Sequence, residues 1–421
     1  MKLKKSDREE SKKSFIGKYY TQAFERIKNI HIGCFGGMDK PLLLISEQYP
    51  GLWIEHVYDS VLWAQLESSY LDIAENAINL FVDRQLDNGQ LPFAVMDLNK
   101  RPDLSEVGAA LYSQIQECVS FFTLALEVYE MNKNSAFLEK AYNSGKKWDE
   151  WLRKYRMTTN RGLIEMFVGY DTGHDNSGRL FGIGCRENYS VEGVIQGADK
   201  IPPEDGVTPI LAVDMNSTFY ADEMALAKMA RLLGKEREAD EWEKSAANIK
   251  KKIFEYCYDE KDAFFYDVDK GGNKRKYKSS TIFHLFMERV LDINSDKDII
   301  DRIYREHIKN PNEFWTPYPF PSMAINDPST KDHAVFNSWG YYTQGLIVLR
   351  CNRWMDYYGY GEDYDYILEK WAEAWSSCYD AVKFAQELDP KTGEPTKSSE
   401  WYSSCMIAYI YAARRLGYPT V

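Results

Sequence analysis

The chain has 421 residues, and its 64 aspartates and glutamates outnumber its 52 lysines and arginines, which gives a net charge of −12. This acidic balance argues against nucleic acid as a partner, because nucleic-acid binders present a basic face, and against an anionic membrane surface. The seven cysteines are scattered without a C-x-x-C pair, so we expect neither a zinc site nor a disulfide framework.

The beginning of the chain, residues 1–13, is a tail of mixed charge without an apolar stretch. No window approaches the roughly 18 uninterrupted apolar residues of a membrane span. We therefore expect no secretory signal, no membrane span and a reducing, cytoplasmic location. No linker rich in serine or glycine interrupts residues 14–421, so we expect them to form a single domain.

Helical periodicity dominates the chain that follows. Apolar residues near 3.6-residue spacing predict a first helix, one longer helix, three pairs of helices joined by short turns, and a last helix. In chain order these are 13–30, 60–83, 116–131 with 136–155, 217–233 with 236–256, 345–358 with 363–378, and 398–416. Gly234 and Gly417 follow apolar runs, where a glycine typically ends a helix.

Successive helical hairpins are compatible with a closed toroid, a solenoid or a bundle. A solenoid would show a fixed period, and these hairpins have none. Four long connections, 157–213, 257–279, 309–335 and 379–397, are rich in aromatic residues and proline. Long loops in a compact domain are usually functional or disordered, and this composition is not a disordered one. We therefore predict an all-α toroid with its long loops on one rim.

The familiar cofactor and nucleophile motifs do not occur in the sequence. The six histidines lie far apart, with no H-x-x-x-H spacing, and residues 267–278 lack the third acid of a calcium loop and have Lys278 in place of its last glutamate. There is no phosphate-binding glycine loop and no G-x-S-x-G. We therefore expect no metal and no cofactor, and carboxylate chemistry remains. Aromatic residues make up 14% of the chain; beyond building a core, such rings also stack on sugars.

Two segments carry candidate carboxylates. Asp175 lies between a histidine and an asparagine inside the longest connection, with Arg179 four residues further on. Glu387 lies just before the last helix and precedes Glu400 and Trp401. Judged alone, the first segment is compatible with a plain turn and the second with a solvent-facing glutamate.

Six segments in order resemble glycoside hydrolase families 63 and 37, the group of processing α-glucosidase, trehalase and mannosylglycerate hydrolase. Residues 172–179 (TGHDNSGR) look like the family's SGWDxSPR, and residues 384–404 look like its FxEYYDPxTG…FxWTS ending. The other four segments are 56–60, 85–92, 213–220 and 336–341. In this order they look like the family's WxWDS, QxxxGxxP, VDLNAxLY and YWRGPxW. The resemblance implies an (α/α)6 barrel.

This chain departs from the family pattern at several positions. His174 stands where the family has tryptophan, and Gly178 where it has proline. Ser338 and Tyr341 alter the YWRGPxW segment, and Leu388 replaces a tyrosine. These changes bear on the substrate more than on the paired acids.

The resemblance implies that Asp175 is the general acid and Glu387 the general base of an inverting glycoside hydrolase that cleaves an α-glycosidic bond. Such a mechanism holds its carboxyl groups about 6.5–9.5 Å apart, which leaves room for the attacking water. Glu400 is the alternative base. We assign Asp59 to sugar hydroxyls, and Arg179 to a substrate hydroxyl or to Glu387. The remaining expected substrate contacts are Tyr58, Trp339 and Trp401 as walls, and Gln114 and Gln116 as hydroxyl readers.

Three other functions are compatible with the same fold. One is a sugar epimerase, which would need histidines as acid and base, and another is an unsaturated-glucuronyl hydrolase, which would use acids. The third is a glycan-binding toroid that has lost its catalytic activity. The expected ligand is a small carbohydrate. The sugar, the linkage and the oligomeric state stay open at this point.

Overall fold

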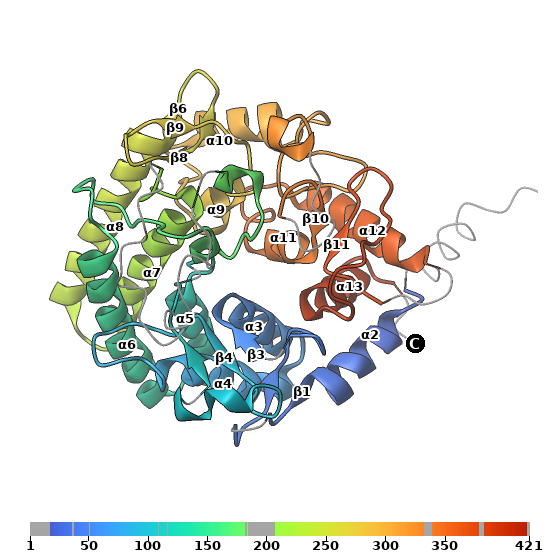
Figure 1. Ribbon diagram of the computed structural model, residues 1–421, viewed down its shortest axis with the longest axis horizontal. Coiled ribbons are helices and arrows are strands. Elements are labelled where there is room, and N and C mark those ends of the chain that lie inside the picture. Colours follow the sequence, from blue (N-terminus) through green and yellow to red (C-terminus); the bar gives the residue numbers. More distant parts are fainter. Residues whose placement is uncertain are drawn as a thin grey trace, which may run out of the picture. The chain divides into compact units, whose positions relative to one another are not determined.

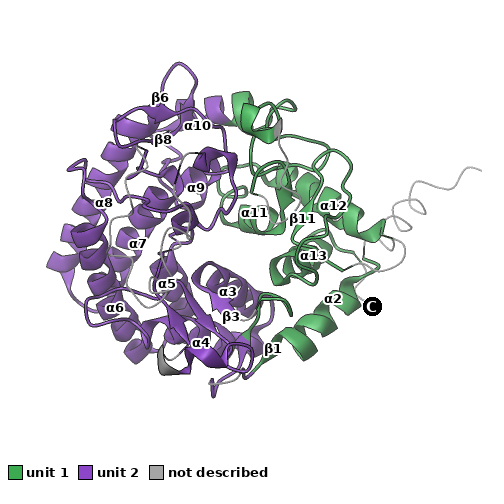
Figure 2. Cartoon of the chain, in the orientation of Figure 1, with its two compact units in different colours: residues 1–33, 43–49, 304–421 green, residues 34–42, 50–303 purple. Residues whose placement is uncertain are grey.

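The structure is a computed structural model. It describes residues 17–35, 38–49, 51–107, 109–115, 117–181, 183, 207–331, 339–378 and 383–418. The expected tail, residues 1–13, lies outside the described residues, as does Gln116. Two compact units divide the chain: unit 1 comprises residues 1–33, 43–49 and 304–421, and unit 2 comprises residues 34–42 and 50–303 (Figure 2).

Unit 2 is built mainly from helical hairpins (Figure 1). Its α-helices are α3 (Val57–Leu66), α4 (Leu71–Val82), α5 (Phe121–Asn132), α6 (Ser135–Tyr155), α7 (Val213–Leu232), α8 (Glu236–Cys257), α9 (Ile282–Met287) and α10 (Lys297–Ile303). Short 3-10 helices are η2 (Ile54–His56), η3 (Ser68–Tyr70), η4 (Pro102–Val107), η5 (Gly169–Thr172) and η6 (Gly178–Leu180). Consecutive helices pack together as α3 with α4, α5 with α6, and α7 with α8.

Small antiparallel sheets connect these hairpins. One sheet has the order β3 (Gly51–Trp53), β4 (Ala94–Met96), β5 (Ala110–Leu111). Two further pairs are β6 (Tyr258–Asp259) with β7 (Phe264–Phe265), and β8 (Asp267–Val268) with β9 (Lys274–Arg275). These strands lie in connections between helices, so they set where the connecting loops run.

The hairpin of α7 and α8 shows why one helix lies inside and the other outside. Helix α7 is buried over most of its surface, with Met224, Lys228 and Leu232 among its exposed residues, and it carries polar residues such as Asp214 and Asp222 into the interior. Helix α8 buries a single stripe that includes Ala246, Ile249 and Ile253 and turns charged residues to solvent. An apolar stripe at helical spacing is typical of an outer helix that packs on an inner one.

Unit 1 combines the beginning and the end of the described chain. It contains α2 (Tyr20–Arg26), the π-helical turn η1 (Ile27–His31), a second π-helical turn η9 (Tyr304–Ile308), the 3-10 turns η10 (Pro328–Lys331) and η11 (Cys351–Arg353), α11 (Gly345–Arg350), α12 (Gly361–Ser376) and α13 (Ser403–Arg415). Strands β10 (Thr343–Gln344) and β11 (Glu387–Leu388) pair antiparallel. The remaining strands, β1 (Ile32–Gly33) and β2 (Leu42–Leu43), lie where the chain passes between the units.

The first and last described helices lie side by side in this unit (Figure 1). The Arg414 guanidinium donates from Nε to the Tyr20 hydroxyl at 2.8 Å. The Tyr19 hydroxyl donates to the Cys378 carbonyl at 2.7 Å, and the Tyr19 backbone N–H donates to the Tyr409 hydroxyl at 3.2 Å. Helix α13 is buried along most of its length and also packs on α11 and α12, so it is the centre of unit 1.

Several of the predicted helices have different bounds in the structure; those expected over 116–131 and 398–416 begin at Phe121 and Ser403. The long helix expected over 60–83 is two helices, α3 and α4, separated by Ser68 and Ser69 in a 3-10 turn. Serines favour such breaks because their hydroxyls compete for backbone hydrogen bonds. The helix expected over 345–358 ends at Arg350, and the helix expected from 217 begins at Val213. Helices α9 and α10 were not predicted.

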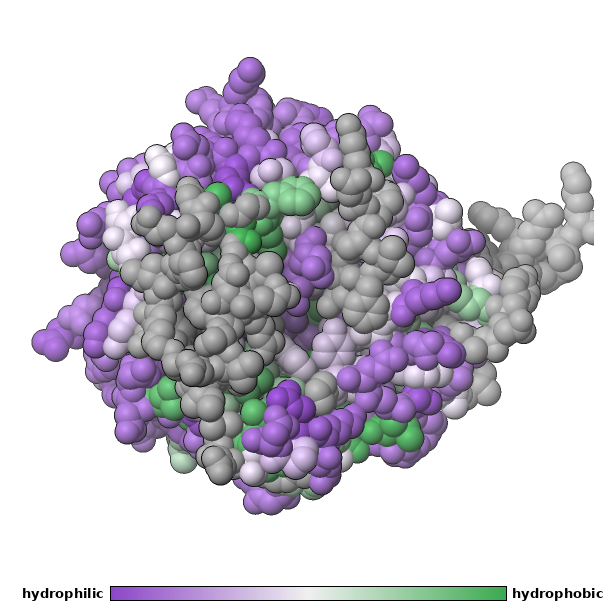
Figure 3. Space-filling view, in the orientation of Figure 1, coloured by the Kyte–Doolittle hydropathy of each residue, from purple (hydrophilic) through white to green (hydrophobic). Residues whose placement is uncertain are grey.

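The surface of the described residues is largely hydrophilic on the face in Figure 3, with small, scattered apolar groups. None of the described helices combines the length and the apolarity that crossing a membrane requires.

Candidate active site

The loop that leads to Asp175 is organised around a buried carboxylate, Asp171. Its Oδ2 accepts a hydrogen bond from Arg156 Nη1 at 2.6 Å and from the backbone N–H groups of residues 167–168 at 2.9 and 3.1 Å. Its Oδ1 accepts the Ile115 N–H at 3.1 Å. Asp171 is fully buried and Arg156 is 1% exposed. A buried charge needs a partner and satisfied lone pairs, and this one has both, so the backbone before Asp175 is fixed.

Two residues after Asp171, Gly173 makes the turn toward Asp175. Its φ of +71° is one that side chains rarely adopt, and a Cβ there would lie 2.8 Å from Cys118 Sγ and 3.1 Å from Glu55 Oε2. Only glycine satisfies both demands. Asp175 itself follows in a half-buried position, so its carboxyl group is placed by a rigid turn and is still partly open to solvent.

Arg179 lies behind this turn, in η6, and is 2% exposed. Its Nη2 donates to Asp214 Oδ2 at 2.5 Å and its Nη1 to Asp267 Oδ2 at 2.6 Å. Asp267 Oδ1 also accepts the Val213 N–H at 2.9 Å. The partner expected for this guanidinium was a substrate hydroxyl or Glu387; the structure instead gives it two buried carboxylates as partners.

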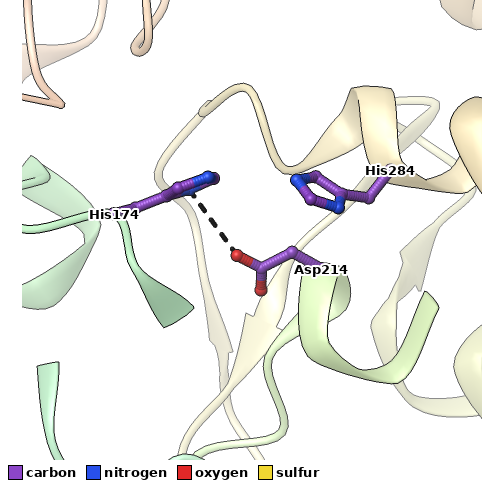
Figure 4. Close-up of side chains that lie close together, drawn as sticks. All are labelled: His174, Asp214 and His284. Atoms are coloured by element: carbon purple, nitrogen blue, oxygen red, sulfur yellow. Dashed lines mark ion pairs between the residues drawn. The ribbon is translucent and has the colours of Figure 1, made fainter. Parts of the chain in front are cut away.

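Asp214, in the first turn of α7, is the centre of this group. Burial raises the pKa of Asp214 to about 6, although Arg179 opposes the rise; the carboxylate of Asp267 adds to it. His174 Nδ1 lies 3.6 Å from Asp214 Oδ2. His284, in α9, faces the same carboxylate, and the two imidazole rings have their centroids 5.7 Å apart (Figure 4). Two histidines that are far apart in the sequence are therefore neighbours around one aspartate.

The expected sugar contacts of unit 2 lie near the start of α3 and beside η5. Tyr58 and Asp59 are in α3 and are 3% and 1% exposed. Gln114 is 3% exposed and donates from Nε2 to the Tyr170 carbonyl at 3.3 Å. Gln114 therefore contacts the same loop that carries Asp175.

A second group of buried carboxylates surrounds the N-terminus of α5. Asp222 Oδ1 accepts the backbone N–H groups of residues 122–123 at 2.8 and 3.2 Å. The Ser120 hydroxyl donates to Glu288 Oε2 at 2.6 Å. Burial raises the pKa of Glu117 to about 8, and Glu288 contributes to that rise. This group therefore holds protons at a pH where exposed carboxyl groups are ionised.

In unit 1, Glu387 lies on β11 directly opposite Gln344 on β10. The Gln344 side-chain amide donates from Nε2 to Glu387 Oε1 at 2.6 Å, and the Thr396 hydroxyl donates to Oε2 at 3.3 Å. The Glu387 side chain is fully buried. Both of its oxygens thus face donors, which suits an ionised carboxylate.

The alternative base has a different environment. Glu400 has a 39% exposed side chain and an ion pair with Lys383 at 2.8 Å. Its neighbour Trp401 carries the Arg26 guanidinium over its ring, 3.9 Å from the centroid. Trp339 is 2% exposed. Residues 336–338 of the same predicted motif lie outside the described residues.

The structure thus places Asp175, Asp171, Arg179 and Gln114 in unit 2, and Glu387, Trp339 and Trp401 in unit 1. Because the two proposed acids belong to different units, the separation of their carboxyl groups stays a prediction. The support formed by residues 156, 171 and 267 was not predicted from the sequence, nor was the position of His284. Asp171 was visible in the same GYDTGHD segment, but only the fold shows what its carboxylate holds.

Comparison with known proteins places this chain in a family. Residues 60–404 match the family model of the mannosylglycerate hydrolase MGH1-like glycoside hydrolase domain. The chain belongs to this family of glycoside hydrolases. The matched segment includes both proposed acids, and it includes Arg179 with its partners Asp214 and Asp267.

The fold of this MGH1-like glycoside hydrolase is shared with solved structures at low sequence identity. The GH63 mannosylglycerate hydrolase from Thermus thermophilus, in complex with glucose, is similar with a TM-score of 0.69 and 15% identity over 93% of this chain and 99% of that chain. Neutral trehalase Nth1 from Saccharomyces cerevisiae is similar with a TM-score of 0.66 and 14% identity over 90% of this chain and 74% of that chain. The expected six-hairpin (α/α)6 fold is confirmed.

An uncharacterised protein of Borreliella burgdorferi is 29% identical over 127 residues, which cover 30% of this MGH1-like hydrolase. The match spans a quarter of the length of that relative. It adds no information about the substrate.

Proposed function

We propose that this glycoside hydrolase cleaves the α-glycosidic bond of a small glycoside with inversion, with Asp175 as general acid and Glu387 as general base. The observation that carries the proposal is the family match over residues 60–404, which includes both acids. The contacts of the two carboxyl groups support the assignment of their roles. The roles need opposite protonation states, since one group gives a proton to the leaving oxygen while the other activates water.

The environment of Glu387 suits the base. Its two oxygens face the amide of Gln344 and the hydroxyl of Thr396, and both groups are donors. A carboxylate held by donors keeps its orientation while it accepts a proton from water. Glu400 is exposed and paired with Lys383, which favours Glu387 as the base.

The environment of Asp175 suits the acid. A general acid has to reach the leaving oxygen of a substrate, and Asp175 is half-buried at the end of a turn fixed by Asp171 and Gly173. In this proposal Arg179 does not contact the sugar. It is a positioning residue that ties the turn to Asp214 and Asp267.

The substrate class is tested with a panel of small α-glycosides that includes mannosylglycerate and trehalose, with product detection. Proton NMR of the first-formed anomer reports the stereochemistry. We expect hydrolysis of at least one member with inverted configuration. Retained configuration would contradict the mechanism, and binding by calorimetry without any turnover would identify the chain as a glycan-binding module.

A further inference from the structure

Three side chains from three separate segments meet inside unit 2. His174 comes from the turn before Asp175, Asp214 from the first turn of α7, and His284 from α9 (Figure 4). One ligand atom from each residue lies within 4.8 Å of the others. Their exposed fractions are 2%, 0% and 3%. Two imidazoles and one carboxylate are a set that binds first-row transition metals.

The spacing of these atoms fits a bound ion better than a direct hydrogen bond. A hydrogen bond would bring His174 Nδ1 and Asp214 Oδ2 to about 2.7–3.2 Å, whereas they lie 3.6 Å apart. Two ligands of a tetrahedral Zn²⁺ ion, each about 2.0–2.1 Å from the metal, lie roughly 3.4 Å from one another. The longest separation, 4.8 Å at most, closes to that value with small rotations of the side chains.

The surroundings orient the aspartate and balance the charge. Asp214 Oδ1 accepts the Met215 N–H at 3.0 Å, while Oδ2 accepts from Arg179 Nη2 and keeps a second lone pair. Ligating carboxylates are typically held by such outer hydrogen bonds. Arg179 is itself paired with Asp267, so the two carboxylates outweigh the guanidinium by one negative charge. A divalent cation beside neutral imidazoles is therefore electrostatically acceptable.

We propose that His174, Asp214 and His284 form a binding site for one divalent transition-metal ion of the Zn²⁺ type. The ion ties the turn at residues 173–179 to α7 and α9, and a three-residue set leaves a fourth position for water. The proposal goes beyond glycoside hydrolysis and does not depend on it. His174 stands where the resembled motif has tryptophan, so the site is a feature of this chain.

The test is a metal titration of the full-length chain after treatment with a chelator. Co²⁺ is added and its visible d–d absorption is followed, and Zn²⁺ is then added as competitor. We expect one equivalent of Co²⁺ to bind and to be displaced by Zn²⁺. His174→Gln and His284→Gln should each weaken binding at least tenfold. The matched control is His31→Gln, because His31 is equally buried, with its Nδ1 3.1 Å from the Leu44 carbonyl oxygen, and lies in unit 1.

A ligand-exchange variant keeps the test decisive if the glutamine variants fail to fold. In His284→Cys the new thiolate should ligate Co²⁺ and add a sulfur-to-metal charge-transfer band in the near ultraviolet. Absence of stoichiometric binding by the wild-type chain would overturn the proposal, as would unchanged affinity in folded His174→Gln and His284→Gln. No substrate is present in these measurements, so failure of the metal site and failure of the hydrolase mechanism are told apart.

Discussion

Asp171 is a structural residue that holds the loop leading to Asp175. Asp171→Ala leaves the buried Arg156 without its carboxylate and three backbone N–H groups without their acceptor. Removing one partner of a buried pair costs about 3–5 kcal/mol. We expect urea denaturation to show a loss of that size. Asp103→Ala, which removes an exposed partner of Arg101, should cost far less than Asp171→Ala; equal losses would contradict the role of Asp171.

The proposed acid and base make a prediction about turnover. Asp175→Asn and Glu387→Gln should each lower kcat by about 10²–10⁴, the usual contribution of a positioned acid or base, with unchanged circular dichroism. Steady-state kinetics on the best substrate of the panel measures the effect. Glu394→Gln, a change at an exposed position, serves as the control. Full activity in Glu387→Gln together with its loss in Glu400→Gln would move the base to Glu400.

At the candidate site, the sequence indicated which residues to consider but not which contacts they make. Asp175, Glu387 and Arg179 were proposed from motifs, because a short segment can signal its chemistry by the order of its residues. The partners of Arg179 were not predictable, since Asp214 and Asp267 belong to other segments and only the fold brings them to its two nitrogens. For the same reason the six histidines appeared unrelated until α9 placed His284 beside Asp214.

At the scale of elements, the turn at Gly173 can be separated into a backbone effect and a packing effect. Gly173 and Gly234 have nearly the same φ, +71° and +72°, but a Cβ meets Cys118 Sγ at 2.8 Å only at Gly173, and nothing lies within 4 Å at Gly234. Gly234→Ala should cost about 1–2 kcal/mol from the left-handed backbone alone. Gly173→Ala should cost about 1–3 kcal/mol more from overpacking. Thermal unfolding measures both, and equal costs would show that the contact yields freely.

Helix bounds show where local sequence signals stop being sufficient. The outer helix α8 was predicted almost to the residue because a single apolar stripe against charged residues has an unmistakable period. Helix α7 begins earlier than predicted, and Ser217, which was read as part of its start, lies inside it and donates to the Val213 carbonyl at 2.8 Å. Inner helices such as α7 are buried over most of their surface, so their polar residues resemble caps until the packing is known.

At the scale of the whole molecule, buried carboxyl groups make stability depend on pH. Burial raises the pKa of Glu117 to about 8, and burial likewise raises the pKa of Glu223 to about 8, although Arg153 opposes the latter rise. In the unfolded chain these carboxyl groups lose their protons near pH 4.5, whereas in the folded chain they keep them up to about pH 8. A rise in pH between these values therefore favours the unfolded chain. We expect the free energy of unfolding to fall over this window, by up to about 1.4 kcal/mol per pH unit for each group.

Urea denaturation between pH 5 and pH 9 measures this dependence. Glu117→Gln should reduce the slope, because glutamine carries no proton to lose. Glu241→Gln changes an exposed residue paired with Arg237 and should leave the slope as it is. An identical slope in wild type and Glu117→Gln would show that this group does not set the pH dependence.

The composition of unit 1 has a consequence for how the protein is made. Helix α2 rests on α13 through Tyr20 and Arg414, and these two residues are separated by most of the chain. During synthesis α2 leaves the ribosome long before its partner exists, whereas the helical hairpins of unit 2 meet their neighbours within a short stretch of translation. Residues 50–303 can therefore acquire structure while the nascent polypeptide is still growing. The apolar side of α2 stays uncovered until the last turns of α13 have been synthesised.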